Sequence, residues 1–134
     1  MKPVHIVLIE DNPADVVLVK LALQESGIAY CLTEFETGRE AVHVLCSPNE
    51  STFVPDAILL DLNTPSTDGF EALHQLKDCP RLAPVPIAIL TSSRARSDKH
   101  RAAIQGARYI EKPTHLHDFL TSVGQAVQEM LVRS

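Results

Sequence analysis

The chain has 134 residues, of which 45% are hydrophobic, and this length suits one globular domain with its own core but not two full domains. Its net charge of -5 and pI near 5.6 argue against nucleic acid as a partner, because domains that bind DNA or RNA are usually basic. The apolar run at the N-terminus is too short for a signal peptide or a membrane span, so we expect a cytoplasmic protein without membrane contact.

Strand and helix signals alternate from the N-terminus onward. Residues 4–9 (VHIVLI) form a continuous run rich in β-branched residues, which predicts a strand buried on both faces. A helix should follow at once, because Asn12 can cap it, Pro13 suits its first position and Asp15 places negative charge near its N-terminal dipole. A shorter strand over 30–35 alternates in character, as an edge strand does.

The middle of the chain continues this alternation. TGRE at 37–40 is a capping box that predicts a second helix, and the polar, proline-bounded segment 47–55 predicts a loop. A third strand then begins with four apolar residues and ends at Asp61. Asp68 and Glu71 are suited to cap a third helix that carries its apolar residues on one face.

The last third of the chain adds two more strand and helix pairs. We expect a fourth strand over 85–91, a fourth helix from Ser97 to near Gly106, and a short fifth strand over 107–111. The final helix is marked by an apolar stripe with three- and four-residue spacing, which comprises Leu116, Phe119, Leu120, Val123, Val127, Met130 and Leu131.

Five successive strand and helix pairs predict an α/β fold with a doubly wound parallel sheet. Each crossover between parallel strands is right-handed and places its helix on a face of the sheet. We expect the flavodoxin-like strand order 2-1-3-4-5 and one domain over residues 1–134, without an output domain. Ligands of such sheets bind at the carboxyl ends of the strands.

Polar side chains gather at that edge of the predicted sheet. Glu10 and Asp11 follow the first strand, Asp61 ends the third, Thr91 ends the fourth and Lys112 follows the fifth. Close carboxylates repel each other unless a cation offsets their charge, and Mg²⁺ prefers oxygen ligands of this kind. Taken singly, each residue has an ordinary explanation as a turn, cap or surface residue, so the inference rests on their coincidence at one edge.

The same residues suit phosphoryl transfer. Asp61 would act as the nucleophile and form an acyl phosphate. Thr91 would donate a hydrogen bond to a phosphoryl oxygen, and the metal and Lys112 would stabilise the negative charge of the phosphoryl group.

The ordered set of motifs resembles a known family. IEDN, Asp61 with Pro65 and Gly69 four and eight residues later, ILTS, and YIEKP are similar to the receiver (CheY-like) domain of two-component response regulators, and the resemblance covers the whole chain. EDNPADV and DLNTPSTDG most resemble stand-alone regulators paired with bacterial phytochrome-type histidine kinases.

This resemblance implies roles for individual residues. Asp61 would take its phosphoryl group from the phosphohistidine of a sensor kinase, and Thr91 and Lys112 would contact the phosphoryl oxygens. Mg²⁺, for which Mn²⁺ may substitute, would be held by the carboxylates of Glu10, Asp11 and Asp61 and the backbone carbonyl of Asn63. Such a protein is a signalling protein, whose only catalysis is its own phosphorylation and dephosphorylation.

The family also implies a switch. Thr91 would move toward the phosphoryl group and let Tyr109 turn inward, which changes the surface made by the fourth helix, fifth strand and fifth helix and signals to a downstream protein. The bond between Lys112 and Pro113 would be cis. Ser93 lies at a position that varies in the family and gates water, so the lifetime of the phosphoryl group stays open.

Three other interpretations compete with this one. DLNT at 61–64 resembles the nucleophile motif of haloacid dehalogenase phosphatases, but Asn63 replaces the second acid and that motif normally follows the first strand. A nucleotide-binding module needs a glycine-rich loop after the first strand, where this chain has EDNPAD. A degenerate receiver acting only as a scaffold is disfavoured, because every catalytic position matches the family.

The first helix also favours a further contact. Its surface is almost entirely apolar, which is more than one face of a sheet buries, and this indicates either a deeply embedded helix or a partner or homodimer contact.

Overall fold

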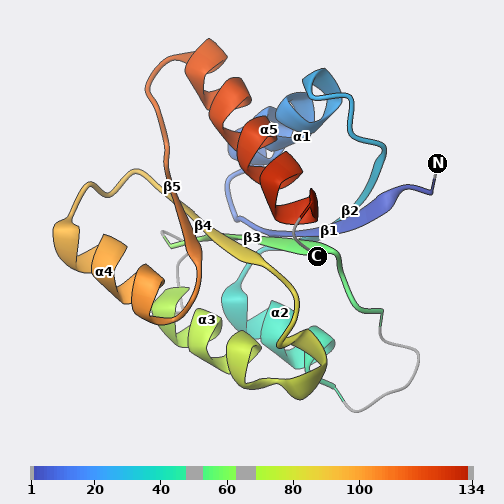
Figure 1. Ribbon diagram of the computed structural model, residues 1–134, viewed down its shortest axis with the longest axis vertical. Helices are drawn as coiled ribbons and strands as arrows, with labels where there is room; N and C mark the ends of the chain where they lie inside the picture. Colours follow the sequence, from blue (N-terminus) through green and yellow to red (C-terminus); the bar gives the residue numbers. More distant parts are fainter. Residues whose placement is uncertain (1, 48–52, 63–68, 133–134) are drawn as a thin grey trace.

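The computed structural model describes residues 2–47, 53–62 and 69–132, and Figure 1 shows a central sheet with helices on both sides. The strands are β1 Val4–Ile9, β2 Tyr30–Phe35, β3 Ala57–Asp61, β4 Ile87–Thr91 and β5 Arg108–Glu111. The helices are α1 Pro13–Glu25, α2 Gly38–Leu45, α3 Gly69–Asp78, the short 3-10 helix η1 Pro80–Leu82, α4 Arg96–Ile104 and α5 Leu116–Val132.

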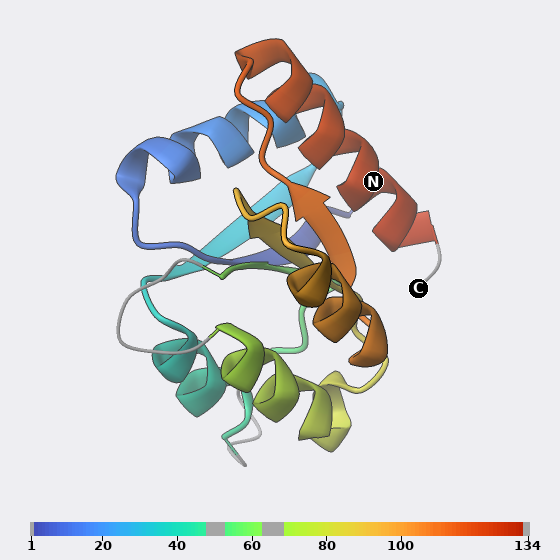
Figure 2. The ribbon, with the colours of Figure 1, turned by 90° about the vertical axis from the view of Figure 1, so that its left-hand side faces the viewer.

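All neighbouring strands of the sheet are parallel, in the order β2-β1-β3-β4-β5. This confirms the predicted flavodoxin-like order. Figure 2 shows α1 and α5 on one face of the sheet and α2 and α3 on the other, with α4 beside the β5 edge. The carboxyl ends of β1, β3, β4 and β5 therefore lie side by side at one edge.

The sheet separates two apolar cores. Successive residues of β3 point to opposite faces: Ala57 and Leu59 pack with α1 and α5, and Ile58 and Leu60 pack with α2 and α3. Every residue of β3 is buried, which explains why its sequence is an unbroken apolar run and not an alternating one.

The capping residues predicted the starts of α1 and α2 correctly. The Asn12 side chain accepts a hydrogen bond from the Ala14 amide at 2.9 Å and Pro13 begins α1, while the Thr37 hydroxyl accepts from the Glu40 amide at 3.1 Å at the start of α2. The Glu40 carboxylate reaches the amide of Glu36, at 3.4 Å, so only half of the predicted capping box is formed.

Elements near prolines and chain turns differ from the prediction. The helix η1 was not predicted, and β4 begins at Ile87, because the Val85 amide bonds to the Leu82 carbonyl in the turn before it. The helix α4 begins one residue before Ser97 and ends at Ile104. Asp68, the expected cap of α3, lies outside the described residues.

Most of the apolar surface of α1 is covered within the fold. Val16, Val19, Ala22 and Leu23 are buried in a core that α5 completes, which explains the excess of apolar residues over what a sheet alone buries. Only smaller apolar areas stay exposed on α1, at Val17 (55% exposed) and Leu21 (38%).

Within the part of the chain that the structure describes, none of the helices combines the length and apolar character needed to cross a lipid bilayer.

The crossing of α1 and α5 is tight at Gly124. A methyl group on Gly124 would overlap the Ser26 hydroxyl and lie 3.2 Å from the Ala22 carbonyl oxygen, and the Ser26 hydroxyl already donates to that carbonyl at 2.8 Å. The close approach of the two helices therefore depends on glycine at this position.

We expect Gly124→Ala to destabilise the protein. Overpacking typically costs about 1–3 kcal/mol, whereas the better helix propensity of alanine returns at most about 1 kcal/mol. The free energy of unfolding, measured in urea, should therefore fall. Adding Ser26→Ala removes the atom that overlaps most and should recover part of the loss; a Gly124→Ala variant as stable as the wild type would contradict the proposed close packing.

Candidate functional site

The carboxyl edge of the sheet brings together the polar residues that the sequence placed there. Glu10 and Asp11 follow β1, Asp61 ends β3, Thr91 ends β4 and Lys112 follows β5. Among the described residues, Glu10 (3% exposed), Asp61 (2%) and Thr91 (0%) are the polar or charged side chains that are buried. Buried polar groups are costly unless they are paired, so this clustering indicates a site and not an ordinary turn.

Three carboxylates form an acidic cluster. Glu10, Asp11 and Asp61 each offer an oxygen, and these oxygens all lie within 4.8 Å of one another. Oxygen ligands at this spacing suit a hard divalent cation such as Mg²⁺, and Asp11, which is exposed, leaves a side open for the waters that Mg²⁺ retains. The donor set therefore fits the predicted metal.

Without a metal, the acidic cluster favours the protonated form of Glu10. The pKa of Glu10 is raised from 4.5 to about 8, first by burial and then by the hydrogen bond and negative charge of Asp61, while the positive charge of Lys112 acts in the opposite direction. A protonated Glu10 can donate a hydrogen bond to Asp61, which relieves the repulsion between the two carboxylates. A divalent cation would replace this proton as the source of positive charge.

Lys112 supplies the ammonium group of the site. Its Nζ donates hydrogen bonds to Asp15 Oδ2 at 2.9 Å, to Asp61 Oδ2 at 3.0 Å and to Glu10 Oε1 at 3.4 Å. Burial alone lowers the pKa of Lys112, but these three carboxylates raise it above its ordinary value. The side chain is therefore charged, and it is aimed at Asp61 from the β5 side.

Asp15 belongs to the site, although sequence reasoning gave it only a role at the helix dipole. It lies in the first turn of α1 and makes the shortest of the ion pairs with Lys112, at 2.9 Å. A signal was present: Asn12 and Pro13 begin α1 directly after β1, so the first turn of this helix must lie at the carboxyl edge of the sheet.

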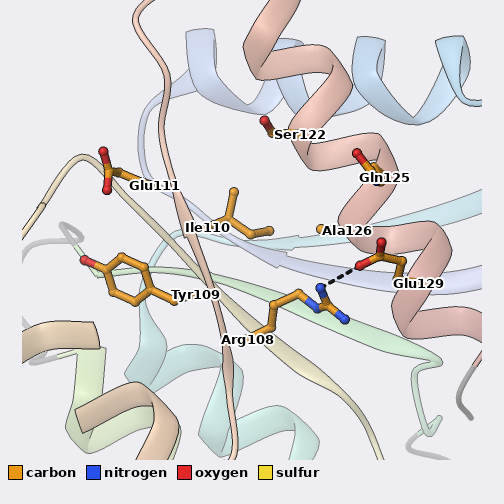
Figure 3. A pocket seen from close by; sticks show the side chains of 8 residues that line it. All are labelled: Arg108, Tyr109, Ile110, Glu111, Ser122, Gln125, Ala126 and Glu129. Atoms are coloured by element: carbon orange, nitrogen blue, oxygen red, sulfur yellow. Dashed lines mark hydrogen bonds and ion pairs between the residues drawn. The ribbon is translucent and has the colours of Figure 1, made fainter. Parts of the chain in front are cut away.

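The two expected switch residues meet at Ser93. Thr91 Oγ1 accepts a hydrogen bond from the Ser93 amide at 3.1 Å, and the Tyr109 hydroxyl donates to the Ser93 carbonyl at 2.7 Å. Figure 3 shows Tyr109 and Glu111 on one side of β5, and Arg108 and Ile110 on the side that faces α5. The hydrogen bond from the Tyr109 hydroxyl to Ser93 thus connects β5 to the loop that follows Thr91.

One residue of the expected site cannot be placed, and one expectation is wrong. Asn63, expected to offer its backbone carbonyl to the metal, lies outside the described residues. The bond between Lys112 and Pro113 was expected to be cis, but no cis peptide bond occurs in the described part of the chain. The trans form is favoured by about 0.5–1 kcal/mol for a bond to proline, and Lys112 reaches its carboxylate partners in that form.

A separate pocket lies beside β5 and α5 (Figure 3) and not at the acidic cluster. It has a volume of about 300 Å³, and an ion pair of 2.7 Å between Arg108 and Glu129 crosses one end of it. Ser122 and Gln125 add polar groups from α5. This pocket lies on the surface for which the sequence predicted a signalling role.

The chemistry available at the acidic edge is the acceptance of a transferred group. Asp61 has a carboxylate oxygen that can act as a nucleophile, an ammonium 3.0 Å away and a potential cation site beside it. Positive charge on both sides of a carboxylate stabilises the oxygens of an incoming phosphoryl group.

Comparison with known proteins supports this interpretation. Residues 6–124 match the family described as "Response regulator receiver domain". The chain is 32% identical, over 90% of its length and 79% of the relative's, to the probable methanogenesis regulatory protein FilR2 of Methanothrix harundinacea. It is 38% identical to the response regulator Rcp1 of Synechocystis, over 72% of this chain and 67% of Rcp1.

Solved structures agree with the sequence matches. The phosphorylated cyanobacterial phytochrome response regulator RcpA superimposes with a TM-score of 0.88 at 31% identity, and the alignment covers 99% of this chain and 97% of RcpA. The Mn²⁺-bound form of Rcp1 superimposes with a TM-score of 0.85 at 32% identity, over 96% of this chain and 95% of that one.

We expect the stability of the metal-free protein to fall between about pH 4.5 and about pH 8. Over this range the folded protein keeps the Glu10 proton that the unfolded chain releases, so the free energy of unfolding decreases as pH rises. Glu10→Gln carries no titrating proton at this position, so its free energy of unfolding should change less over the same pH range. The difference between the changes in the wild type and in the variant should be at least about 1.4 kcal/mol, the value of one pKa unit.

Urea unfolding in the presence of a chelator measures this difference. Glu25→Gln, at an exposed position at the end of α1, is the matched control and should follow the wild type. A Glu10→Gln variant whose stability has the same pH dependence as the wild type would contradict the assignment of the raised pKa.

Proposed function

The chain belongs to the response regulator receiver domain family, and we propose that it is a stand-alone regulator whose residues 1–134 form a single receiver domain phosphorylated on Asp61. One observation carries this proposal: the buried Asp61 carboxylate lies 3.0 Å from the Lys112 ammonium and within 4.8 Å of carboxylate oxygens of Glu10 and Asp11.

The proposed reaction transfers a phosphoryl group from a phosphohistidine. An Asp61 oxygen attacks phosphorus, the bond between phosphorus and the histidine nitrogen breaks, and the electron pair of that bond stays on the imidazole. Lys112 donates a hydrogen bond to a phosphoryl oxygen in place of its bond to Asp61, and the Thr91 hydroxyl donates a hydrogen bond to another. Asp15 keeps the Lys112 ammonium at the site, because its 2.9 Å bond does not involve Asp61.

Mg²⁺ or Mn²⁺, when bound by Glu10, Asp11, Asp61 and the backbone carbonyl of Asn63, would offset the negative charge of the phosphoryl oxygens. The fit of the three carboxylates to a hard cation and the Mn²⁺-bound form of Rcp1 support this metal site. Without a cation, three acidic groups would face an incoming phosphoryl group with Lys112 as the local counter-charge.

The proposed output is a change of surface. Attraction of Thr91 to the phosphoryl group alters the Ser93 contacts that also hold Tyr109, and this changes the face formed by α4, β5 and α5. The pocket beside β5 lies on this face and offers a site for a downstream protein. Phosphorylation would come from a sensor histidine kinase in the cytoplasm. The likeness to RcpA, which is described as a cyanobacterial phytochrome response regulator, supports a kinase of the phytochrome type.

A homodimer is a further part of the proposal. Val17 and Leu21 lie one turn apart on the outer surface of α1 and stay exposed, so they offer an apolar contact for a second copy or for the kinase.

We expect Asp61→Asn to abolish labelling by acetyl phosphate in the presence of Mg²⁺, because the amide nitrogen and oxygen of asparagine do not form an acyl phosphate. The mass of the intact protein measures the label. Asp118→Asn, which makes the same change at an exposed position in the first turn of α5, should label like the wild type.

Labelling that survives unchanged in Asp61→Asn would show that Asp61 is not the acceptor. Repeated turnover of p-nitrophenyl phosphate by the wild-type protein, instead of one label per chain, would favour a phosphatase of the haloacid dehalogenase type.

We expect Asp11→Asn to weaken Mg²⁺ binding by at least about tenfold, which corresponds to 1.4 kcal/mol. The reason is that a hard cation loses one charged oxygen ligand. Titration calorimetry measures the affinity, and the Mg²⁺-dependent rise in melting temperature gives an independent value. Asp118→Asn is again the control, and equal affinities of Asp11→Asn and the control would remove Asp11 from the metal site.

A further inference from the structure

Helix α4 is held to the rest of the protein mainly by polar contacts. Ala102 is the residue of this helix that is buried. An ion pair of 3.3 Å between Lys99 and Glu111 anchors the helix, as does the guanidinium of Arg101, which lies 4.0 Å from the centroid of the Phe70 ring. Because few apolar contacts hold α4, its local opening should cost less free energy than that of helices with a buried apolar face.

The N-terminus of α4 has no side-chain cap of its own. Its N-cap residue is Ala95, whose methyl group cannot accept a hydrogen bond. The hydroxyl of Ser93 instead bridges this turn, since it accepts from the amide of the N-cap residue Ala95 at 3.2 Å and donates to Asp98 Oδ2 at 2.7 Å. A hydroxyl can do both at once because it has one donor and two acceptor positions. Ser93 therefore holds the first turn of α4.

The backbone of Ser93 contacts the two switch residues. Its amide donates to Thr91 Oγ1 at 3.1 Å, and its carbonyl accepts from the Tyr109 hydroxyl at 2.7 Å. Thr91 is buried at the acidic edge of the sheet, whereas Tyr109 comes from β5. Three parts of the protein, the site, β5 and α4, are therefore joined through one residue.

We propose that Ser93 is a positioning residue that couples Thr91 and Tyr109 to the first turn of α4, with its hydroxyl bridging the Ala95 amide and the Asp98 carboxylate. Movement of the Thr91 hydroxyl toward a phosphoryl group displaces the acceptor of the Ser93 amide. The Ser93 hydroxyl then changes its position relative to the Ala95 amide and the Asp98 carboxylate. The stability of the first turn of α4 thereby depends on the state of Asp61.

This inference deepens the proposed function and rests on it. It identifies how one event at Asp61 reaches a helix with little apolar anchoring, and it does not require α4 to touch the phosphoryl group. Coupling of this kind is a difference in the stability of α4 between the two states of the site.

Amide hydrogen exchange of α4 tests the proposal. Two of its amides, those of Asp98 and Lys99, bond to the Ala95 carbonyl at 3.1 and 3.2 Å and report directly on the first turn. In the wild type, labelling by acetyl phosphate with Mg²⁺ should change their exchange rates. In Ser93→Ala these amides should exchange about fivefold faster before labelling, the loss expected when a typical intramolecular hydrogen bond is removed, and should no longer respond to the label.

Two serine variants separate coupling from a general loss of stability. Ser93→Thr keeps a hydroxyl at the same position and should retain the response to labelling. Ser97→Ala removes an exposed hydroxyl from the same helix and should behave as the wild type. A Ser93→Ala variant that still responds to labelling as Ser97→Ala does would overturn the proposal.

A variant at the N-cap position tests the proposal without weakening the fold. Ala95→Ser places a capping hydroxyl at the N-cap position, so α4 should exchange more slowly and respond less to labelling, because its first turn then depends less on Ser93. A response of wild-type size in Ala95→Ser would contradict the proposed coupling.

The mass of the intact protein, measured on the same samples, distinguishes a failure of this inference from a failure of the proposed function. Label on Asp61 with an unchanged α4 in the wild type would overturn this inference alone. Absence of label in the wild type would overturn the proposed function, and the inference with it.

Discussion

The ion pairs of Lys112 are the interaction on which the rest of the site depends. One ammonium faces the carboxylates of Asp15, Asp61 and Glu10 at 2.9 to 3.4 Å, and two of these acids are almost completely buried. Removing one partner from a buried ion pair leaves an uncompensated charge, which is strongly destabilising. Three carboxylates face one ammonium, and this excess of negative charge favours both protonation of Glu10 and binding of a divalent cation. A bound cation would in turn offset the negative charge of a phosphoryl group on Asp61.

The parallel sheet confines these repelling groups to one edge, so they do not disturb the apolar cores. Strands β3 and β4 are buried along their whole length, and their apolar side chains serve the cores on both faces. Polar groups enter only where these strands end, at Asp61 and Thr91. Stability thus comes from the cores, and the edge is free to carry groups that repel each other.

Two kinds of helix connect to that edge. The helices α1 and α5 share an apolar core and approach closely at Gly124, so packed side chains hold both to the sheet. In contrast, α4 is anchored by ion pairs, a cation–π contact and the hydroxyl of Ser93. A local change of charge at Asp61 can alter a helix held by such contacts, whereas it would have little effect on one held by a packed core.

The sequence by itself determined the order of elements, the parallel sheet and the clustering of Glu10, Asp11, Asp61, Thr91 and Lys112, because periodicity, capping residues and the carboxyl-edge rule are properties of local sequence and topology. Tertiary structure alone decided the pairing of Asp15 with Lys112, the raised pKa of Glu10 and the meeting of Thr91 and Tyr109 at Ser93. It also replaced the expected cis bond at Pro113 with a trans bond and added η1. These features depend on distances of a few ångströms between segments far apart in the chain, and strand register, loop geometry and burial set those distances.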